Sequence, residues 1–377
     1  MKNVGIVTAR DRLTIQFTSA EIWAVVEDFV ALHPEEAREK YKLGDDAQEW
    51  RVERAQNDLR GGKGPSKRKV VPIQYRPFDV RATYYTGQSA GFMGRPRPDV
   101  MTHLLGKQNI ALHVCRQLVS DAYQHASVTS LITDDCYVSN KSSERGYTIP
   151  LYVNPPATLL PDDRPRNPHG QVCNLNPSVV KDLENVFGKR LVVSDAEASP
   201  ETFMPEDVFG YAYVLLYSPV YRERHSDLLR RDFPRIPFTR DFDLFMNLAS
   251  LGRRLVEIHT NLKNVSPDSV TYPVAGTNIV ESGYPILADT DFESGSLLAS
   301  LRVYINKSQY FHGIHADEWE FEMGSYQPCE KWLKDRRGRC TLSHSELNHY
   351  RSMVVGIKET IAIMGQIDQA VPKWPLD

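Results

Sequence analysis

The sequence predicts an α+β protein, and three observations carry that prediction. Apolar residues recur at the spacing typical of helices in several segments, and short runs rich in Val, Ile, Thr and Tyr, typical of strands, lie between them. The 377 residues, 41% of them hydrophobic and 25% charged, suffice for a sizeable core in two or three sub-domains. The predicted regions are a helical spacer at 1–62, a mixed β-rich core with packed helices at 63–265, and a β-rich part with a terminal helix at 266–377.

Helices dominate the N-terminal region. Residues 1–17 predict two short strands or a strand and a turn, after which Ser19 is expected to cap the first helix. Over residues 1–59 twelve acids stand against eight bases, so we do not expect this region to contact phosphates directly. The helices predicted here lie at about 21–32, 34–42 and 46–60.

From Val70 onward the pattern becomes β-rich. Arg76-Pro77-Phe78-Asp79 is expected to form a turn between the first two strands. Asp79 and Arg81 are either an ion pair that braces this turn, the interpretation that we favour, or part of a functional surface. The strands predicted here lie at 70–75, 80–85, 110–115, 127–133 and 147–153, and one helix at about 98–105 interrupts them.

Basic residues concentrate between Arg60 and Arg116. This stretch holds eleven Lys or Arg residues against two acids, although the whole chain has a net charge of −3. Tyr75, Tyr84 and Phe92 interleave with these bases, which suits a surface that binds a polyanion and stacks on nucleobases. The alternative is a solvated basic face of the kind that many enzymes carry.

Arg95 and Arg97 are the strongest candidates for such contacts. They lie in a loop rich in Gly and Pro, where no carboxylate follows until Asp99. A guanidinium can donate two hydrogen bonds side by side to guanine or to a phosphate, so we predict that this loop contacts nucleic acid, with a solvated loop as the alternative. Weaker candidates on the same reasoning are Lys107, Arg116, Lys141 and Arg145.

A second basic segment lies near the C-terminus. Residues 331–339 hold five bases against one acid, which suits phosphate contact; alternatively, Trp332 and Leu333 pack while the charges are merely solvated. The candidates for phosphate contact in this segment are Lys334, Arg336, Arg337 and Arg339. The other predicted elements are helices at 177–187, 205–217 and 240–260, strands between 270 and 325, and a final helix capped by Ser343.

No motif predicts catalysis or metal binding by this chain. Asn154-Pro155-Pro156-Ala157 lacks the aromatic fourth residue with which adenine methyltransferases stack on a flipped adenine, so we interpret it as a loop. Residues 61–65 lack the spacing of a phosphate-binding loop, and no histidine pair has the company of Cys or acids that a metal site needs. We therefore predict no catalytic residue and no metal ligand.

The composition predicts a cytoplasmic protein. Five cysteines without a C-x-x-C pair are typical of thiols in a reducing compartment. No apolar run approaches the ~20 residues of a membrane-spanning helix, and the first residues lack the apolar core of a signal peptide. We expect no membrane partner.

Three stretches resemble one family of bacterial proteins. The motif YRPFDxR at 75–81 with the following YY and RPR, the passage YSP…YR…FPRIP, and GxYQ…KWLKDRRGR before the final helix resemble the target recognition domain of type ISP and type IIG restriction-modification proteins. The opening GIxTxRD resembles the segment that follows their adenine-N6 methyltransferase domain. The resemblance covers essentially the whole chain, most firmly at 72–116, 211–238 and 324–368.

The resemblance implies a specificity module for double-stranded DNA. The catalytic domain would have ended where this chain begins, so the partner would be an adenine methyltransferase domain or subunit that uses S-adenosylmethionine, with a nuclease or helicase in some of these proteins. This chain itself would hold no cofactor. The alternatives are a degenerate stand-alone methyltransferase or nuclease, and a protein-interaction scaffold. The family motif places Tyr75, Arg76, Phe78, Asp79, Arg81 and Trp332 in structural roles.

Overall fold

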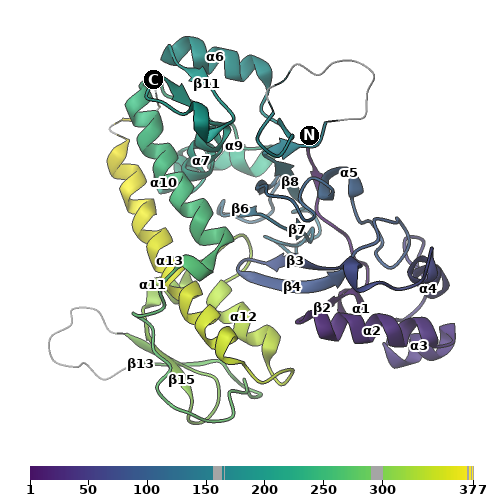
Figure 1. Ribbon diagram of the computed structural model, residues 1–377. Helices are drawn as coiled ribbons and strands as arrows, with labels where there is room; N and C mark the ends of the chain where they lie inside the picture. The colour runs from purple at the N-terminus through teal and green to yellow at the C-terminus, as the bar shows by residue number, and fades with distance from the viewer. Residues whose placement is uncertain (156–163, 165, 290–299, 372, 375, 377) are drawn as a thin grey trace. The chain divides into compact units, whose positions relative to one another are not determined.

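The chain forms two units, which Figure 1 shows as a ribbon. Unit 1 comprises residues 1–117 and 128–176, and unit 2 comprises residues 118–127 and 177–377. Both contain helices and sheets, which confirms the predicted α+β class. The chain passes between the units within 117–128 and after 176, whereas composition predicts boundaries after 62 and 265. The computed structural model describes residues 1–155, 164, 166–289, 300–371, 373–374 and 376.

Unit 1 contains two four-stranded sheets. These sheets confirm the β-rich pattern predicted from Val70 onward, because every predicted run contains one or two of the strands. The first has the order β2-β4-β3-β7, with strands at Ile15–Gln16, Asp79–Tyr84, Val70–Arg76 and Ile132–Thr133. The second has the order β1-β8-β5-β6, with strands at Asn3–Val4, Gly146–Pro150, Ala111–Cys115 and Ala126–Thr129. A separate pair consists of β9 (Tyr152–Val153) and β10 (Val172–Cys173).

The β3–β4 hairpin turns through the two residues Pro77 and Phe78, as predicted, because Arg76 pairs directly with Asp79. Phe78 has a φ of 59°, a conformation that this turn position usually reserves for glycine. Its side chain is nevertheless buried, with 4% of its surface exposed. Burial of the ring therefore accompanies a backbone conformation that a phenylalanine adopts only under constraint.

The N-terminal helices begin where side chains can cap them. Thr18, not the predicted Ser19, caps α2, because its hydroxyl accepts from Glu21 N–H at 3.1 Å while the Glu21 carboxylate accepts from Thr18 N–H at 3.0 Å. The helix predicted from 46 begins only at Val52, whose N–H donates to Asp46 at 3.2 Å. The helices of unit 1 are α1 (Asp11–Thr14), α2 (Ser19–Ala31), α3 (Pro34–Lys40), α4 (Val52–Arg60) and α5 (Pro98–Met101).

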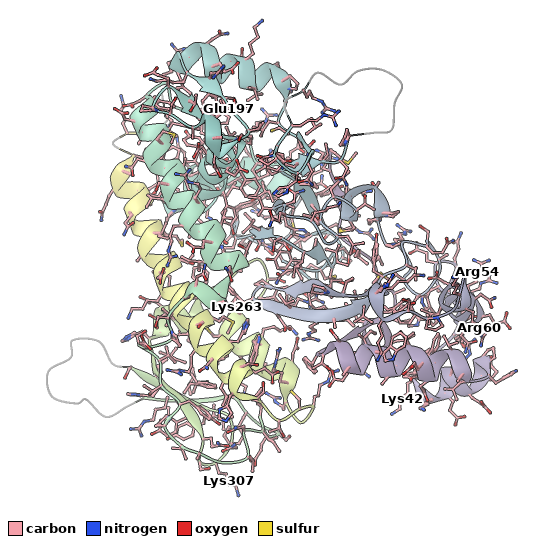
Figure 2. All side chains as sticks on the ribbon, viewed as in Figure 1. Lys42, Arg54, Arg60, Glu197, Lys263 and Lys307 are labelled. Atoms are coloured by element: carbon pink, nitrogen blue, oxygen red, sulfur yellow. The ribbon has the colours of Figure 1, made fainter. Side chains whose placement is uncertain are left out.

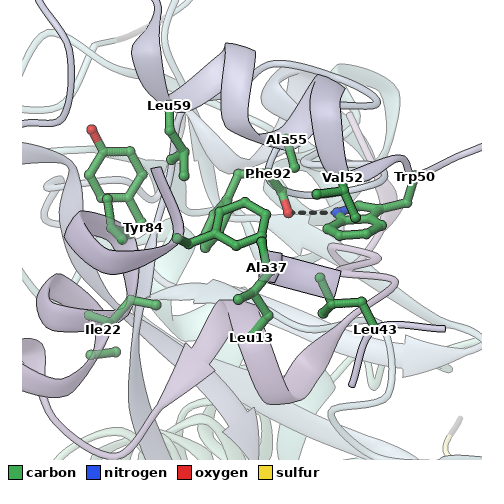
Figure 3. Packing of buried hydrophobic residues seen from close by; sticks show 13 residues of the cluster. Leu13, Ile22, Ala37, Leu43, Trp50, Val52, Ala55, Leu59, Tyr84 and Phe92 are labelled. Atoms are coloured by element: carbon green, nitrogen blue, oxygen red, sulfur yellow. Dashed lines mark hydrogen bonds between the residues drawn. The ribbon is translucent and has the colours of Figure 1, made fainter. Parts of the chain in front are cut away.

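Helices α1 to α4 share a hydrophobic core with the first sheet (Figure 3). Ile22 and Phe29 from α2 are fully buried in the same cluster as Tyr84 of β4 and Phe92, and the Tyr84 and Phe92 rings meet edge to face at 6.1 Å. The Trp50 indole N–H donates to the Phe92 carbonyl at 3.1 Å, the dashed line in Figure 3. Residues 1–60 are thus packed into unit 1, although composition predicts a separate spacer.

Unit 2 is mainly helical. Its helices are α6 (Pro177–Phe187), α7 (Pro205–Leu215), α8 (Pro219–Arg224), α9 (Ser226–Arg231), α10 (Phe242–Thr260), α11 (Ala316–Glu320), α12 (Pro328–Arg336) and α13 (His344–Ala370). Its strands are β11 (Arg190–Leu191) and β12 (Thr202–Phe203), which are parallel, and the antiparallel sheet β13 (Ile286–Asp289), β14 (Leu301–Tyr304) and β15 (Tyr310–Ile314). Ser343 caps α13 as predicted, since its hydroxyl accepts from Glu346 N–H at 3.3 Å.

Helix α10 contacts both α7 and α13 (Figure 1). Helices α7 and α10 approach so closely at Gly210 and Gly252 that a Cβ atom on Gly252 would lie 1.9 Å from the Gly210 carbonyl oxygen. Only glycine at this crossing allows the two backbones to meet. Within the described residues, no helix has both the length and the apolar content needed to cross a bilayer.

A buried histidine links the three helices. On α10, Nδ1 of His259 lies 2.6 Å from the Tyr213 hydroxyl of α7, and Nε2 lies 3.0 Å from the Thr360 hydroxyl of α13. Because the Thr360 hydroxyl donates to the Gly356 carbonyl, it accepts from Nε2–H. The Tyr213 hydroxyl has two acceptors within reach, Nδ1 at 2.6 Å and the Tyr217 hydroxyl at 3.3 Å, and the shorter distance favours donation to Nδ1. The neutral imidazole therefore satisfies both partners, and burial lowers the pKa of His259 to about 3.

Because of this histidine, we expect the free energy of unfolding of unit 2 to decrease when the pH is lowered below 6.5. In the unfolded chain His259 binds a proton at its ordinary pKa of 6.5, whereas the folded unit excludes that proton until about pH 3. Its contribution is full above pH 6.5 and decreases by about 1.4 kcal/mol per pH unit below it. The control His259→Gln can make both hydrogen bonds but does not titrate. Urea unfolding between about pH 7 and pH 5 should show a shallower decline for this variant; parallel declines would contradict the assignment.

Candidate functional site

A loop of residues 86–97, here called the arginine loop, carries the two strongest candidates for nucleic-acid contact. The N-terminal helices hold it in place. The Asp58 carboxylate of α4 accepts hydrogen bonds of 2.8 Å from the Phe92 N–H and from the Thr86 hydroxyl. The Trp50 indole donates to the Phe92 carbonyl from the other side. The conformation of the loop therefore depends on residues 50 and 58, which lie in the region predicted to be a spacer.

The arginine loop also pairs with the chain that follows β1. Val7 and Arg95 exchange backbone hydrogen bonds of 3.0 and 2.9 Å. Ala9, Ala90 and Arg97, in or beside this pairing, have φ angles of 65°, 54° and 54°. Left-handed conformations of non-glycine residues cost about 1–3 kcal/mol each and concentrate at binding sites and switch regions. Their grouping at this loop favours a function for it.

Arg97 is held between two prolines. Its carbonyl accepts from the N–H groups of Val100 and Met101 at 3.1 and 2.9 Å, and the buried Tyr85 hydroxyl donates to the Pro96 carbonyl at 3.1 Å. The side chain is half-buried, and its Nε atom is buried without an acceptor. No hydrogen bond or ion pair joins the Arg97 guanidinium to any residue that the structure describes.

Arg95 and Arg145 surround Arg97 with positive charge. Burial and the charge of Arg95 lower the pKa of Arg97, Arg145 acts in the same direction, and Asp99 and Asp135 oppose them. Arg95 forms an ion pair with Glu49, whereas Arg145 is exposed immediately before β8. Arg145, which is distant from the arginine loop in the sequence, thus acts on the same guanidinium as Arg95, and we call Arg95, Arg97 and Arg145 the arginine cluster.

The other three weaker candidates of unit 1, besides Arg145, are also exposed. Lys107 lies in the turn that follows α5, and Arg116 follows β5 directly. The ammonium of Lys141 lies 4.0 Å from the carboxylate of Glu144, which is buried, so Lys141 has an acidic partner of its own. Their contact with nucleic acid stays a prediction.

The YRPFDxR motif forms a mostly buried ionic group. Arg81 donates hydrogen bonds of 2.9 and 2.7 Å to Oδ2 of Asp79, which confirms the predicted brace of the turn. The guanidinium carbons of Arg76 and Arg81 lie 3.8 and 4.0 Å from the centre of the Tyr75 ring. The motif therefore stabilises the hairpin, and none of its arginines is a candidate for ligand contact.

Asp134 completes this group. Its carboxylate accepts from Arg76 at 2.6 Å, and burial raises its pKa to about 7 although Arg76 acts against that rise. Asp134, Asp135 and Cys136 offer ligand atoms within 4.8 Å of one another, the arrangement expected of metal ligands. Because Arg76 already neutralises the buried carboxylate, we explain this group by the ion pair and propose no metal there.

In unit 2, the basic segment at 331–339 is largely committed to packing. Trp332 and Leu333 are buried, which confirms the packing alternative for these two residues. Arg336 is also buried: its guanidinium carbon lies 3.5 Å from the centre of the Trp332 ring and its Nε lies 3.4 Å from Glu346. We therefore do not carry Arg336 forward as a phosphate contact. Lys334 pairs with Glu330 at 2.6 Å, Arg337 is half-buried, and Arg339 is exposed.

The Asn-Pro-Pro-Ala stretch lies partly outside the described residues, which end at 155 and resume at 164. Asn154 itself is described. Its N–H donates to Nδ1 of His103 at 3.0 Å, and its side-chain amide donates to the Thr102 carbonyl at 3.3 Å. A hydrogen bond to another part of the chain thus occupies the amide group of the side chain that a methyltransferase would use to bind adenine.

Sequence reasoning missed the residues that support the arginine loop. Glu49, Trp50 and Asp58 lie 28 to 46 residues before their partners, and no local pattern marks such pairs. The sequence did signal that the loop itself has restricted backbone freedom, because Pro96 and Pro98 flank Arg97.

The chain matches one described family. Residues 1–366 match the family described as Type ISP C-terminal specificity domain. A search of curated proteins finds no match. Likeness to solved structures that are less than 20% identical in sequence establishes a shared fold. The solved structures with that fold include a DrdV–DNA complex (TM-score 0.63, 18% identity), a nuclease-deletion mutant of the type ISP enzyme LlaGI with a DNA substrate mimic (0.60, 15%), and the ATP-dependent type ISP enzyme LlaBIII bound to DNA (0.64, 15%).

These likenesses cover nearly all of this chain and a minor part of each solved protein. The matches include 97%, 98% and 100% of this chain but 36%, 27% and 23% of the DrdV, LlaGI and LlaBIII chains, respectively. This chain therefore spans about a third or less of the length of those proteins.

Proposed function

Because this chain belongs to the type ISP C-terminal specificity domain family, we propose that it is the DNA sequence-recognition module of a restriction-modification system. The observation that carries the proposal is the arginine cluster of unit 1. Arg95, Arg97 and Arg145 converge on a loop with an enforced backbone, in a chain whose net charge is −3. Because the chain as a whole has a negative net charge, its overall charge would not attract a polyanion. A local positive cluster on such a chain therefore indicates a specific binding surface for one.

In this proposal the module divides affinity and specificity between two kinds of contact. Exposed bases such as Lys107 and Arg145 bind phosphates, which supplies affinity and its dependence on salt. A few loop side chains that reach base edges in a groove supply specificity. In unit 2 the candidates for phosphate contact are Arg337, which is half-buried, and Arg339, which is exposed, whereas Arg336 is buried.

The chemistry on DNA would belong to other parts of the system. The module would present a target adenine to an adenine-N6 methyltransferase domain or subunit, which would use S-adenosylmethionine, and this chain would need no cofactor of its own. A nuclease or helicase domain is a further partner in such a system. The module would act where the DNA is, in the cytoplasm. A stand-alone methyltransferase is not favoured, because Asn154 is bonded to Thr102 and His103.

The proposal predicts that removing Arg145 of the arginine cluster together with Lys107, a second exposed basic residue of unit 1, weakens DNA binding. The double variant Lys107→Ala/Arg145→Ala removes two charges that form no hydrogen bond or ion pair with a described residue, so the fold should persist. At ~0.1 M salt we expect the affinity of the whole chain for mixed-sequence duplex DNA to fall about 10- to 50-fold, because two phosphate contacts and their counterion release are lost. Fluorescence anisotropy measures this.

The matched control is Arg51→Ala/Arg54→Ala, which also removes two charges from exposed positions of unit 1. Both residues lie at the beginning of α4 in the acidic N-terminal region, where Arg54 is labelled in Figure 2. We expect this control to bind DNA nearly as the wild type does. Equal losses in the two double variants would show that only total charge matters and would contradict the proposed site.

A further inference from the structure

We propose that Arg97 reads a guanine of the recognised sequence by donating hydrogen bonds to its O6 and N7 atoms, an inference that rests on the proposed function. The other basic residues of the site would contact phosphates. The assignment depends on three properties of Arg97: an enforced backbone, a guanidinium without a partner among the described residues, and positively charged neighbours.

The backbone of Arg97 is held on both sides. Pro96 and Pro98 flank it, and proline fixes one of the two soft torsions of each flanking residue. Tyr85 anchors the Pro96 carbonyl, and Arg97 itself has φ 54° and ψ 52°, a conformation that a non-glycine residue keeps only where its surroundings enforce it. A phosphate contact tolerates a mobile side chain, whereas reading a base edge needs donors at a defined place.

The guanidinium of Arg97, which is half-buried, has no carboxylate partner among the described residues; Arg145 also forms no ion pair, but it is exposed. Arg76, Arg81 and Arg95 each pair with an acid of unit 1. Arg97 pairs with no residue in the described part of the chain, and its Nε has no acceptor. The N–H groups of the half-buried Arg97 guanidinium are therefore left to donate to a ligand.

The two acids whose charges act on Arg97, Asp99 and Asp135, have other hydrogen-bond partners. Asp99 accepts a hydrogen bond of 2.6 Å from the Asn3 amide, and the Cys136 thiol lies 3.5 Å from the Asp135 carboxylate. Neither therefore needs to turn toward Arg97. The two arginines of the loop therefore differ: the Arg95 guanidinium donates to Glu49, whereas the Arg97 guanidinium has no such acceptor among the described residues.

Guanine fits these properties better than the other bases. In the major groove it presents two adjacent acceptors, O6 and N7, which match the two parallel donors of a guanidinium. Adenine presents an acceptor beside a donor, and that donor would face an N–H group of arginine. Arg95 and Arg145 next to Arg97 would attract the phosphates on either side and so hold the base edge within reach.

The test is selection of bound sequences from a randomised duplex library by the whole chain, with the wild type and two variants. Arg97→Gly removes the side chain and adopts the positive φ without strain, so the loop backbone is kept. Lys107→Ala removes an exposed base that is assigned to a phosphate. Circular dichroism and thermal unfolding confirm that each variant is folded.

We expect the wild type to enrich one sequence, and Arg97→Gly to enrich the same sequence with one guanine position randomised. On the wild-type site, Arg97→Gly should lose about 10- to 100-fold in affinity while its affinity for unrelated duplexes changes little. Lys107→Ala should weaken binding to all sequences alike.

Two results would overturn the inference while the proposed function stands. Arg97→Gly could enrich the wild-type sequence with every guanine intact, or it could weaken all sequences equally, which would make Arg97 a phosphate contact. Failure of the wild type to enrich any sequence would instead overturn the proposed function, and the inference with it.

Discussion

Replacing Gly252 with alanine should destabilise unit 2 by at least about 3 kcal/mol, at the upper end of what overpacking costs in a close-packed interior. The added Cβ atom would lie 1.9 Å from the carbonyl oxygen of Gly210 and 2.4 Å from its carbonyl carbon. Both are backbone atoms of α7, so no side chain can rotate away and the helices must separate. That separation would also strain the contact between Tyr213 of α7 and His259 of α10.

The same substitution elsewhere in unit 2 should have the opposite effect. Gly365 lies on the exposed face of α13, and a Cβ atom there would meet nothing within 4 Å. Gly365→Ala should therefore stabilise the helix by about 0.5–1 kcal/mol, the difference in helix propensity between the two residues. Urea unfolding of both variants measures the contrast. Similar small changes in the two would contradict the close crossing of α7 and α10.

Replacing Arg76 with methionine should cost unit 1 about 3–5 kcal/mol, because it leaves a buried carboxylate without its ion pair. Arg76 bonds to Asp134 at 2.6 Å, and the side chain of Asp134 is only 3% exposed. The guanidinium also lies 3.8 Å from the centre of the Tyr75 ring, a contact that methionine retains only in part. Removing one partner of a buried pair costs more than the pair itself contributes.

A second substitution should restore most of this loss. In Arg76→Met/Asp134→Asn the buried charge is absent, and the asparagine carbonyl can still accept from the Cys136 N–H, as Asp134 does at 3.0 Å. A double-mutant cycle by urea unfolding separates the interaction of the pair from the two single effects. If Asp134→Asn gives no rescue in the Arg76→Met background, the unpaired charge is not the cause of the loss.

Local rules predicted the elements that depend on local sequence. Helix α6 occupies the predicted residues 177–187, and the cap at Ser343 and the turn at 76–79 are where the sequence places them, because caps, proline and apolar spacing act over a few residues. The cap of α2 was wrong by one residue, since Thr18 and Ser19 are both good caps and the position of Glu21 decides between them.

Tertiary pairing is what the sequence could not reveal. Residues 1–60 have the composition of a separate acidic helical region, yet Trp50 and Asp58 pack against or bond to a loop more than 30 residues away. Arg95 was recognisable as a surface arginine, but its pairing with Glu49 required the structure. The burial of Arg336 was predicted by neither alternative, because one placed its charge on a phosphate and the other in solvent; in the structure its side chain stacks on Trp332, one helical turn before it.

The salt dependence of duplex DNA binding by the wild-type chain tests the central claim most directly. A module that places several bases on phosphates should bind mixed-sequence duplex at low salt, and the logarithm of its affinity should fall against the logarithm of salt concentration with a slope steeper than about −3. A chain of net charge −3 that binds no duplex at low salt, or binds with a slope near zero, would contradict the account.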